Sequence, residues 1–306
     1  MQIHHLVKIA VVVATVLLLQ SCGAINWNQE PPYSLVNTWG EKGSNPGQFN
    51  DPTGIAVTSN EVFVSDARNS RIQVFDKMGN FKRAFGQQQL GRPMNLAIAN
   101  DTLFVPDYFK DAVHVFALDG QYQGAIETSP ALDSPGGVAV FPDGDLLVAD
   151  TYGQRLVRVS PEGSQRRTWS GKGIWSGEFN YPTSIAVDNN GGFYVADGYN
   201  DRVQQFGTDG EYIRKWGGPF GLNIFGPFKG WFATVTSIAI GPEGNLFVTD
   251  FYNNRIQKFT AEGDYLTSFG VESDGPGQTE IAVAVDSDGT VWSVNFEANR
   301  VEQWRP

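Results

Sequence analysis

Short apolar runs and polar turns alternate along this chain in a pattern that recurs six times. Each copy opens on a run rich in Ile, Val and Ala, crosses a turn, and continues into a second apolar run that ends on Asp or, in the last copy, on Asn. In four copies the turn holds Gly after Asp, Asn or Glu, which supplies the positive φ of a tight hairpin. The alternation therefore predicts a β-hairpin in each copy. The closing positions are Asp66, Asp107, Asp150, Asp197, Asp250 and Asn295.

Two further strands complete each copy. A third run, such as RIQVF or RVQQF, follows the closing position, and a second Gly turn leads to a fourth run that often ends in an aromatic residue and Gly. The closing positions are separated by 41 to 53 residues. A four-stranded unit repeated at this period is typical of the blades of a β-propeller, so an all-β fold is expected.

The two ends of the chain share the last blade. Tyr33–Gly40 reads YSLVNTWG and matches fourth strands such as YIRKWG at 212–217, whereas the chain ends at Pro306, just after the third strand of the last copy. We expect the N-terminal strand to complete the last blade and so to close the ring without a free edge. The prediction is a six-bladed β-propeller of four-stranded antiparallel blades over residues 34–306.

Two recurring motifs resemble the NHL-repeat family across roughly 35–304. The first is Gly47-x-Phe49-x-x-Pro52 followed by Ile-Ala-Val, with a near copy at 177–187, and the second is an Asp-x4-Arg step such as Asp250 to Arg255. The resemblance implies a six-bladed propeller. Because members of the family are mostly binding and scaffold modules, it implies a chemistry much less strongly.

The N-terminus has the features of a targeting segment. Lys8 precedes eleven mostly apolar residues, Ile9–Leu19, which are too few to span a bilayer as a helix. Leu19-Gln20-Ser21-Cys22-Gly23 then resembles a bacterial lipobox. We predict a lipoprotein signal peptide at 1–21, lipidation at Cys22 and a tether at 22–33, with an ordinary secretory signal as the alternative. The protein would then belong to the cell envelope, and to the outer membrane if the host has one, held by its lipid alone.

Composition narrows the class of partner. The net charge of −11 at pH 7 repels phosphate backbones and argues against nucleic acid. Cys22 is the single cysteine, so burial and strand pairing must hold the fold without a disulfide. We expect a monomeric propeller whose partner is an envelope protein or another extracytoplasmic ligand.

The Asp-x4-Arg step recurs in four copies. A repeated ion pair that braces the loop between the second and third strands explains this recurrence better than a catalytic site, which normally breaks symmetry. Asp107 is followed at the matching place by Ala112, so its carboxylate must remain solvated or find another cation. The predicted structural pairs are Asp66/Arg71, Asp150/Arg155, Asp197/Arg202 and Asp250/Arg255.

Aromatic residues mark a candidate ligand- or partner-binding face. Four of them follow the closing Asp by two positions: Phe109, Tyr152, Tyr199 and Tyr252. They form either a binding platform or packing between blades. The longest interval contains the aromatic-rich segment 217–234, GGPFGLNIFGPFKGWFAT, which supplies Phe225 and Trp231 as further candidates. This segment is expected on the same face, as an exposed contact surface or as a lid folded onto the propeller.

Catalysis finds little support in the residues. The family resemblance extends to six-bladed relatives that include a lyase with histidine-held zinc and lactonases with calcium. His114 is the single His after Cys22, which rules out a His-rich zinc site. Asn95, Asp107 and Glu280 are weak candidates for calcium ligands. We therefore predict a binding scaffold without a catalytic residue or cofactor. A calcium-dependent, lactonase-like hydrolase or lyase is the alternative, and a purely structural subunit of an envelope complex is a third possibility.

Overall fold

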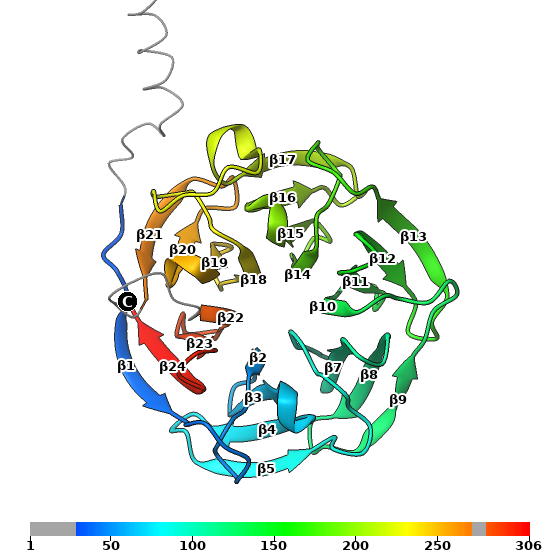
Figure 1. The fold of residues 1–306 in the computed structure, drawn as a ribbon, viewed down its shortest axis with the longest axis vertical. Helices are drawn as coiled ribbons and strands as arrows, with labels where there is room; N and C mark the ends of the chain where they lie inside the picture. The colour runs from blue at the N-terminus through cyan, green and yellow to red at the C-terminus, as the bar shows by residue number, and fades with distance from the viewer. Residues whose placement is uncertain (1–28, 271–279) are drawn as a thin grey trace, which may run out of the picture. The chain divides into compact units, whose positions relative to one another are not determined.

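The computed structural model describes residues 29–270 and 280–306, and Pro31–Pro306 form one compact unit. This unit is a ring of six four-stranded antiparallel sheets, as the sequence predicts (Figure 1). The predicted signal peptide and Cys22 lie outside the described residues. In the described part of the chain no helix has the length and apolar character needed to cross a membrane.

The blades follow one another around the ring in chain order. Blade 1 consists of β2 (Pro52–Val57), β3 (Glu61–Asp66), β4 (Arg71–Asp76) and β5 (Phe81–Phe85). Blade 2 consists of β6 (Ala97–Ala99), β7 (Thr102–Asp107), β8 (Ala112–Ala117) and β9 (Tyr122–Ile126). Blade 3 consists of β10 (Pro135–Val140), β11 (Leu146–Asp150), β12 (Arg155–Val159) and β13 (Gln165–Ser170). Blade 4 consists of β14 (Pro182–Val187), β15 (Phe193–Asp197), β16 (Arg202–Phe206) and β17 (Tyr212–Trp216). Blade 5 consists of β18 (Val235–Ile240), β19 (Leu246–Asp250), β20 (Arg255–Phe259) and β21 (Tyr265–Phe269).

Blade 6 joins the two ends of the ring. It contains β22 (Glu280–Val285), β23 (Val291–Asn295), β24 (Arg300–Arg305) and β1 (Ser34–Trp39), in the order β1-β24-β23-β22. β1 pairs antiparallel with β24, with Leu35 opposite Trp304 and Trp39 opposite Val301. In Figure 1 the blue β1 lies beside the red β24. The predicted closure by the N-terminal strand is confirmed.

Apolar side chains fill the spaces between neighbouring blades. Leu147 and Leu156 of blade 3 pack in one buried cluster with Phe193 and Phe206 of blade 4, whose rings stack at 4.8 Å. Inner strands divide their side chains between two such layers: Leu147 and Ala149 of β11 lie in this cluster, whereas Leu146 and Val148 lie in the cluster shared with blade 2. Burial of apolar surface between blades therefore stabilises the ring.

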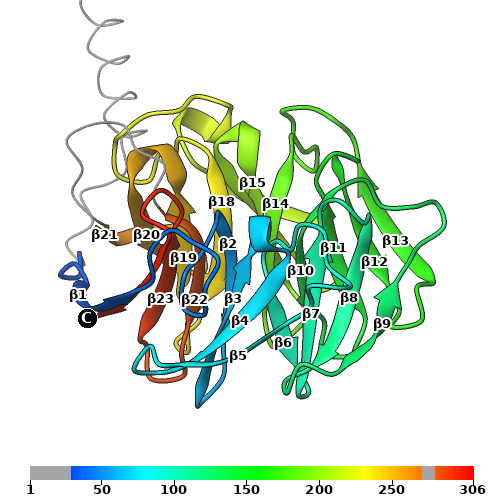
Figure 2. The same ribbon diagram turned by 60° about the horizontal axis from the view of Figure 1, so that its bottom comes forward.

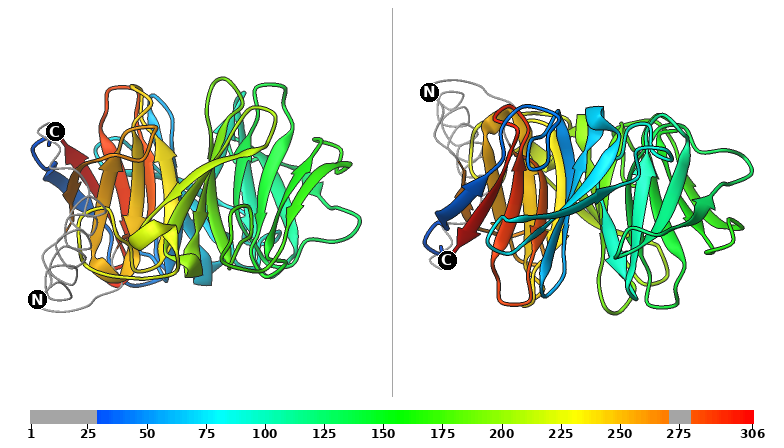
Figure 3. Two further views of the ribbon diagram at one scale, coloured as in Figure 1. Left: turned by 90° about the horizontal axis from the view of Figure 1, so that it is seen from above. Right: turned by 90° about the horizontal axis from the view of Figure 1, so that it is seen from below.

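Connectivity places two kinds of loop on one face of the ring. Because successive strands in a blade are antiparallel, the loop between its second and third strands shares a face with the connection to the next blade. Three of these loops contain short 3-10 turns, η1 (Ala67–Asn69), η2 (Gly198–Asn200) and η4 (Phe251–Asn253), and η3 (Pro219–Gly221) lies in the connection from blade 4 to blade 5. Figure 2 shows the strands running between the two faces, and Figure 3 shows the propeller edge-on. We call this face the loop face.

Candidate ligand-binding face

Four buried ion pairs lie beneath the loop face. In each pair Asp ends the second strand, Arg begins the third strand opposite it, and Arg Nε donates to Asp Oδ2. None of the four Asp side chains is exposed to solvent. Burial raises the pKa of Asp250 to about 6, although the Arg255 guanidinium lowers it. The Nε–Oδ2 distances are 2.7 Å for Asp66/Arg71, 2.5 Å for Asp150/Arg155, 2.7 Å for Asp197/Arg202 and 2.8 Å for Asp250/Arg255.

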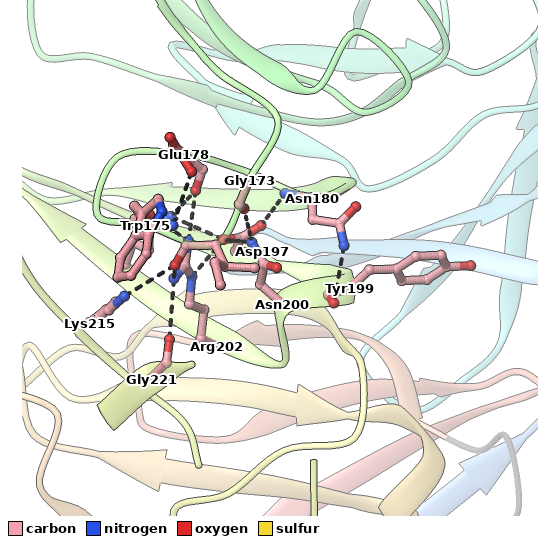
Figure 4. A network of polar contacts seen from close by, with 12 residues as sticks. Gly173, Trp175, Glu178, Asn180, Asp197, Tyr199, Asn200, Arg202, Lys215 and Gly221 are labelled. Carbon is pink, nitrogen blue, oxygen red and sulfur yellow. Dashed lines mark hydrogen bonds and ion pairs between the residues drawn. The ribbon is translucent and has the colours of Figure 1, made fainter. Parts of the chain in front are cut away.

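Arg202 ties three segments together (Figure 4). Besides its bond to Asp197, its guanidinium donates to the carbonyls of Trp175 (2.9 Å) and Gly221 (3.2 Å). It also donates to the carbonyls of Ile174 and Glu178. Trp175 belongs to the connection that enters blade 4 and Gly221 to the connection that leaves it. The Arg202 guanidinium therefore joins the connections on both sides of blade 4 to the buried Asp197 carboxylate.

A glutamine completes this network in three blades. Gln204 Nε2 donates to Asp197 Oδ2 at 3.0 Å, and its Oε1 accepts the Gly177 amide at 2.9 Å. Gln73 and Gln257 make the same two contacts in blades 1 and 5. This role of the glutamine was not predicted from the sequence, although the spacing Asp-x4-Arg-x-Gln recurs in these three blades.

Blade 6 keeps the network with its carboxylate moved to the next strand. Asn295 occupies the Asp position and Glu302 the Gln position. Glu302 Oε1 accepts hydrogen bonds from Arg300 Nε at 2.8 Å and from Asn295 Nδ2 at 3.0 Å. Arg300 therefore keeps one carboxylate partner. Asn295 departs from the sequence motif, but the Arg–carboxylate ion pair is retained in this blade.

This exchange predicts a compensating pair of substitutions. Asn295→Asp adds a further carboxylate beside the buried Glu302, where the Glu280 carboxyl group already lies, and is expected to lower the free energy of unfolding by about 2 kcal/mol. Adding Glu302→Gln recreates the arrangement of blade 1 and is expected to recover most of that loss. A double-mutant cycle from urea unfolding measures the coupling, and additive effects would contradict it.

Asp107 corrects the expectation of a solvated or cation-paired carboxylate. Its side chain is fully buried and accepts hydrogen bonds from the amides of Gly91 (2.5 Å), Arg92 (2.9 Å) and Phe109 (3.0 Å). Backbone amides therefore make the hydrogen bonds that the Arg guanidinium makes in the other blades. His114 Nε2 lies 4.0 Å away, and burial lowers the pKa of His114, which favours the neutral imidazole.

The three weak calcium candidates have separate surroundings. Asp107 faces the amides just described, whereas Asn95 Nδ2 donates to the carbonyls of Thr183 (3.3 Å) and Thr236 (3.2 Å). Glu280 is buried in blade 6 beside Glu302. Across residues 29–270 and 280–306 no three His, Cys, Asp or Glu side chains are grouped as a metal site requires.

A row of aromatic rings crosses the loop face over blades 2 to 4, and we call it the tyrosine arc. Its rings are those of Phe109, Tyr108, Tyr152, Tyr181 and Tyr199. Successive centroids are 5.6, 5.6, 5.0 and 4.9 Å apart. Phe109, Tyr152 and Tyr199 are 64%, 49% and 55% exposed. Figure 4 shows Tyr199 directed away from the Arg202 network. The predicted aromatic residues therefore have open ring surface.

Tyr252 lies outside this continuous row, on blade 5. It is 45% exposed, and its ring contacts that of Phe251 at 5.1 Å.

Burial and the Tyr152 hydroxyl raise the pKa of Tyr108 to about 12, and burial likewise raises the pKa of Tyr199. The two phenols therefore remain neutral hydrogen-bonding groups near pH 7.

Two members of the arc were missed in the sequence analysis. Tyr108 directly follows Asp107, and Tyr181 precedes Pro182 in the motif that enters blade 4. Tyr181 has φ 52°, in the left-handed region that tyrosine rarely adopts. Asp51, Ser134 and Thr234 occupy the same strand-entry position in other blades, also with positive φ. The positions of Tyr108 and Tyr181 next to the repeat motifs indicated that they lie at the ends of strands. The sequence alone does not show that their rings come into contact with those of the arc.

The segment 217–234 combines the two alternatives left open by the sequence. Phe232 is fully buried against blade 5, and Trp231 is half-buried with its ring 5.0 Å from that of Phe228. Phe220, Phe225 and Phe228 are 78%, 73% and 61% exposed. The segment is therefore anchored at its C-terminal end and presents apolar side chains to solvent along the rest.

Comparison with known proteins identifies the repeats. The family model of the NHL repeat matches residues 49–75, 132–158, 179–206 and 232–259. Protein brain tumor of Drosophila melanogaster is 31% identical over 134 residues, which cover 41% of this chain and 13% of that protein. Human E3 ubiquitin-protein ligase TRIM32 is 32% identical over 139 residues, which cover 40% of this chain and 21% of that protein. The chain thus matches only a small part of these relatives.

Solved structures show the same fold at low identity. A Bacteroides thetaiotaomicron protein of unknown function superposes with a TM-score of 0.70 and 15% identity, covering 89% of this chain and 75% of that chain. A streptogramin B lyase superposes with a TM-score of 0.63 and 13% identity, covering 89% of this chain and 97% of that chain. At these identities the similarity concerns the architecture and not the chemistry.

Proposed function

We propose that this chain, a six-bladed β-propeller built from NHL repeats, is an exported, lipid-anchored binding scaffold of the bacterial cell envelope. Its ligand is an envelope protein or another extracytoplasmic molecule, held on the loop face beside Tyr152, Tyr199, Tyr252 and the segment 217–234. Export and anchoring are supported by the apolar segment 9–19 and by Cys22 in its lipobox-like context. The observation that carries the binding role is the tyrosine arc.

The chemistry of the arc suits a binding surface. Tyrosine gives a large apolar ring and a hydroxyl with few rotatable bonds, so contact area is gained at a small cost in conformational entropy. The rings of the arc already support one another at 4.9 to 5.6 Å. Arg92 lies 5.8 Å from the Tyr108 ring and adds a cation at one end. A preorganised aromatic row of this kind matches the features of interface hot spots.

Substitution of the exposed tyrosines tests this proposal. The variant Tyr152→Ala/Tyr199→Ala/Tyr252→Ala is expected to reduce capture of the partner at least tenfold, because hot-spot aromatics contribute about 2 kcal/mol each. Partners are cross-linked to the full chain in its own membrane and identified by mass spectrometry, with deletion of 217–234 as a second arm. The control is Tyr122→Ala, 39% exposed at the turn end of blade 2. If the triple tyrosine variant captured as much partner as Tyr122→Ala, the tyrosine arc would be excluded as the binding surface. The chain would then be better explained as a structural subunit of an envelope complex.

The metal-dependent hydrolase or lyase is not proposed as a second function. Its candidate ligands do not converge in the described residues, and the lyase among the solved structures shares only the architecture. The relatives named as ubiquitin ligases match 40% of this chain and 21% of their own length, so their names do not extend to this chain.

A further inference from the structure

Two neighbouring connections on the loop face expose a group of large apolar side chains, which we call the apolar rim patch. One connection enters blade 4 and the other leaves it. The six side chains are between 41% and 78% exposed. Soluble proteins rarely leave so many neighbouring large apolar residues in water, and such a surface usually marks a contact site. The patch comprises Ile174, Trp175, Phe220, Ile224, Phe225 and Phe228.

The backbone under the patch is held from below. The Arg202 guanidinium donates to the carbonyls of Ile174 and Trp175 on one connection and of Gly221 on the other. Lys215 Nζ also donates to the Ile174 carbonyl at 3.3 Å. Figure 4 shows Trp175, Lys215 and Gly221 gathered around Arg202. The polar groups of both connections are therefore satisfied toward the propeller, while the apolar side chains are left to face outward.

The charge of the two connections differs from that of the rest of the chain. Residues 171–181 and 217–234 together contain Lys172 and Lys229 and a single acidic residue, Glu178, and Lys215 in β17 adds a third lysine beside them, in a chain of net charge −11. The Glu178 carboxylate accepts the Trp175 amide at 3.0 Å. By sequence these residues carry two more positive than negative charges, and the ammonium groups of Lys172 and Lys229 lie over the rings of Tyr181 and Tyr265 at 6.0 and 5.6 Å.

We infer that the apolar rim patch rests on a lipid bilayer that carries anionic headgroups. Trp and Phe side chains favour the boundary between headgroups and acyl chains, and flanking lysines are attracted to anionic lipid. An acidic protein partner would instead require only the lysines, and an apolar partner only the rings. The combination of both fits a membrane surface. The inference assigns the exposed rings of the segment 217–234 to the membrane, and it leaves the tyrosine arc as the contact surface for the partner of the proposed function.

Hydroxyl-radical footprinting of the full chain tests the inference directly. The full chain is bound to vesicles of phosphatidylcholine with 30% phosphatidylglycerol and compared with the same chain on vesicles of phosphatidylcholine alone. Labelling of Trp175, Phe220, Phe225 and Phe228 is expected to fall at least fivefold on the anionic vesicles. Met78, 75% exposed at a turn on the opposite face, is the internal control and should keep its labelling. Unchanged labelling of the four rings would overturn the inference.

Matched variants separate the patch from any lipid contact made by other parts of the chain. Trp175→Ser/Phe220→Ser/Phe225→Ser is expected to abolish the protection of Phe228 on the anionic vesicles. Met78→Ser/Tyr122→Ser changes exposed apolar residues elsewhere and should bind as the parent does. Lys172→Gln/Lys229→Gln should remove the preference for anionic vesicles. Protection of the rings by a protein partner but by neither kind of vesicle would overturn the inference, and circular dichroism verifies that each variant is folded.

Discussion

Replacing Arg202 by Ala is expected to lower the free energy of unfolding by about 3–5 kcal/mol, the largest effect of any single substitution considered. Both partners of the Arg202–Asp197 pair are fully buried. The substitution leaves the Asp197 carboxylate without its cation, in surroundings where burial already raises its pKa. It also removes the donor to the carbonyls of Trp175 and Gly221, so the loops on both sides of blade 4 lose their common support.

Arg155 provides the matched comparison on blade 3. Its side chain is 20% exposed, and besides Asp150 it donates to the Ala131 carbonyl. Water can replace part of these contacts, so Arg155→Ala is expected to cost only about 1–2 kcal/mol. Urea unfolding of the two variants, followed by circular dichroism, measures the difference. A cost for Arg202→Ala no greater than for Arg155→Ala would show that the extra carbonyl contacts contribute nothing.

The network explains why the repeated pair could be located from sequence but its importance in each blade could not. The Asp-x4-Arg spacing places the two residues opposite each other across a hairpin, which is a local consequence of strand register. The further partners of Arg202 lie in connections 19 to 28 residues away. Their positions depend on how the blades pack, and the sequence motif does not specify that packing.

The hydrogen bonds that link neighbouring blades could likewise be predicted only in part from the sequence. The fourth residue after each closing Asp or Asn adopts positive φ, and in four blades its side chain bonds the amide of the residue that enters the next blade. Asn299 Oδ1 accepts the Asp51 amide at 3.0 Å and so joins the last blade to the first. Asn and Asp tolerate this conformation, which the sequence indicates. The partner, 248 positions away, follows only from the closed ring.

Departures from the repeat are where the sequence predicted least about the site. Tyr181 stands where other blades have Asp, Ser or Thr, and its ring bridges Tyr152 and Tyr199. Asn295 was recognised as a departure, but its compensation by Glu302 was not. In both cases the repeat gives the position of the backbone, and the substituted side chain then gives the blade a property that the others lack. The tyrosine arc is therefore a feature of particular blades and not of the repeat.

Glu280 is the other position where a large effect is expected. It begins β22, where blades 1, 3 and 4 have Pro52, Pro135 and Pro182, and it is fully buried beside Glu302. In the described part of the chain neither of its carboxyl oxygens meets the geometry of a hydrogen bond, although the Glu302 and Ser293 side chains lie near enough to affect its pKa. Burial and the Glu302 carboxylate raise the pKa of Glu280 well above 4.5, against smaller opposing effects of Ser293 and Arg300. As pH rises above 4.5 the folded protein therefore holds the Glu280 proton more tightly than the unfolded chain does.

The sign of the pH dependence follows from this proton. Stability linked to a raised pKa is fully present below the unfolded value of 4.5 and is lost as pH rises above it. Glu280→Gln keeps the shape of the side chain and removes the titration. It is expected to leave the free energy of unfolding nearly unchanged at pH 4 and to raise it by about 2–3 kcal/mol at pH 8. Urea titrations of parent and variant across this range measure the effect.

Glu302→Gln serves as the contrast, because it deprives Arg300 of its carboxylate and should not stabilise the protein. A constant difference between parent and Glu280→Gln at all pH values would mean that Glu280 is ionised in the folded ring, and that blade 6 tolerates two buried carboxylates beside one arginine.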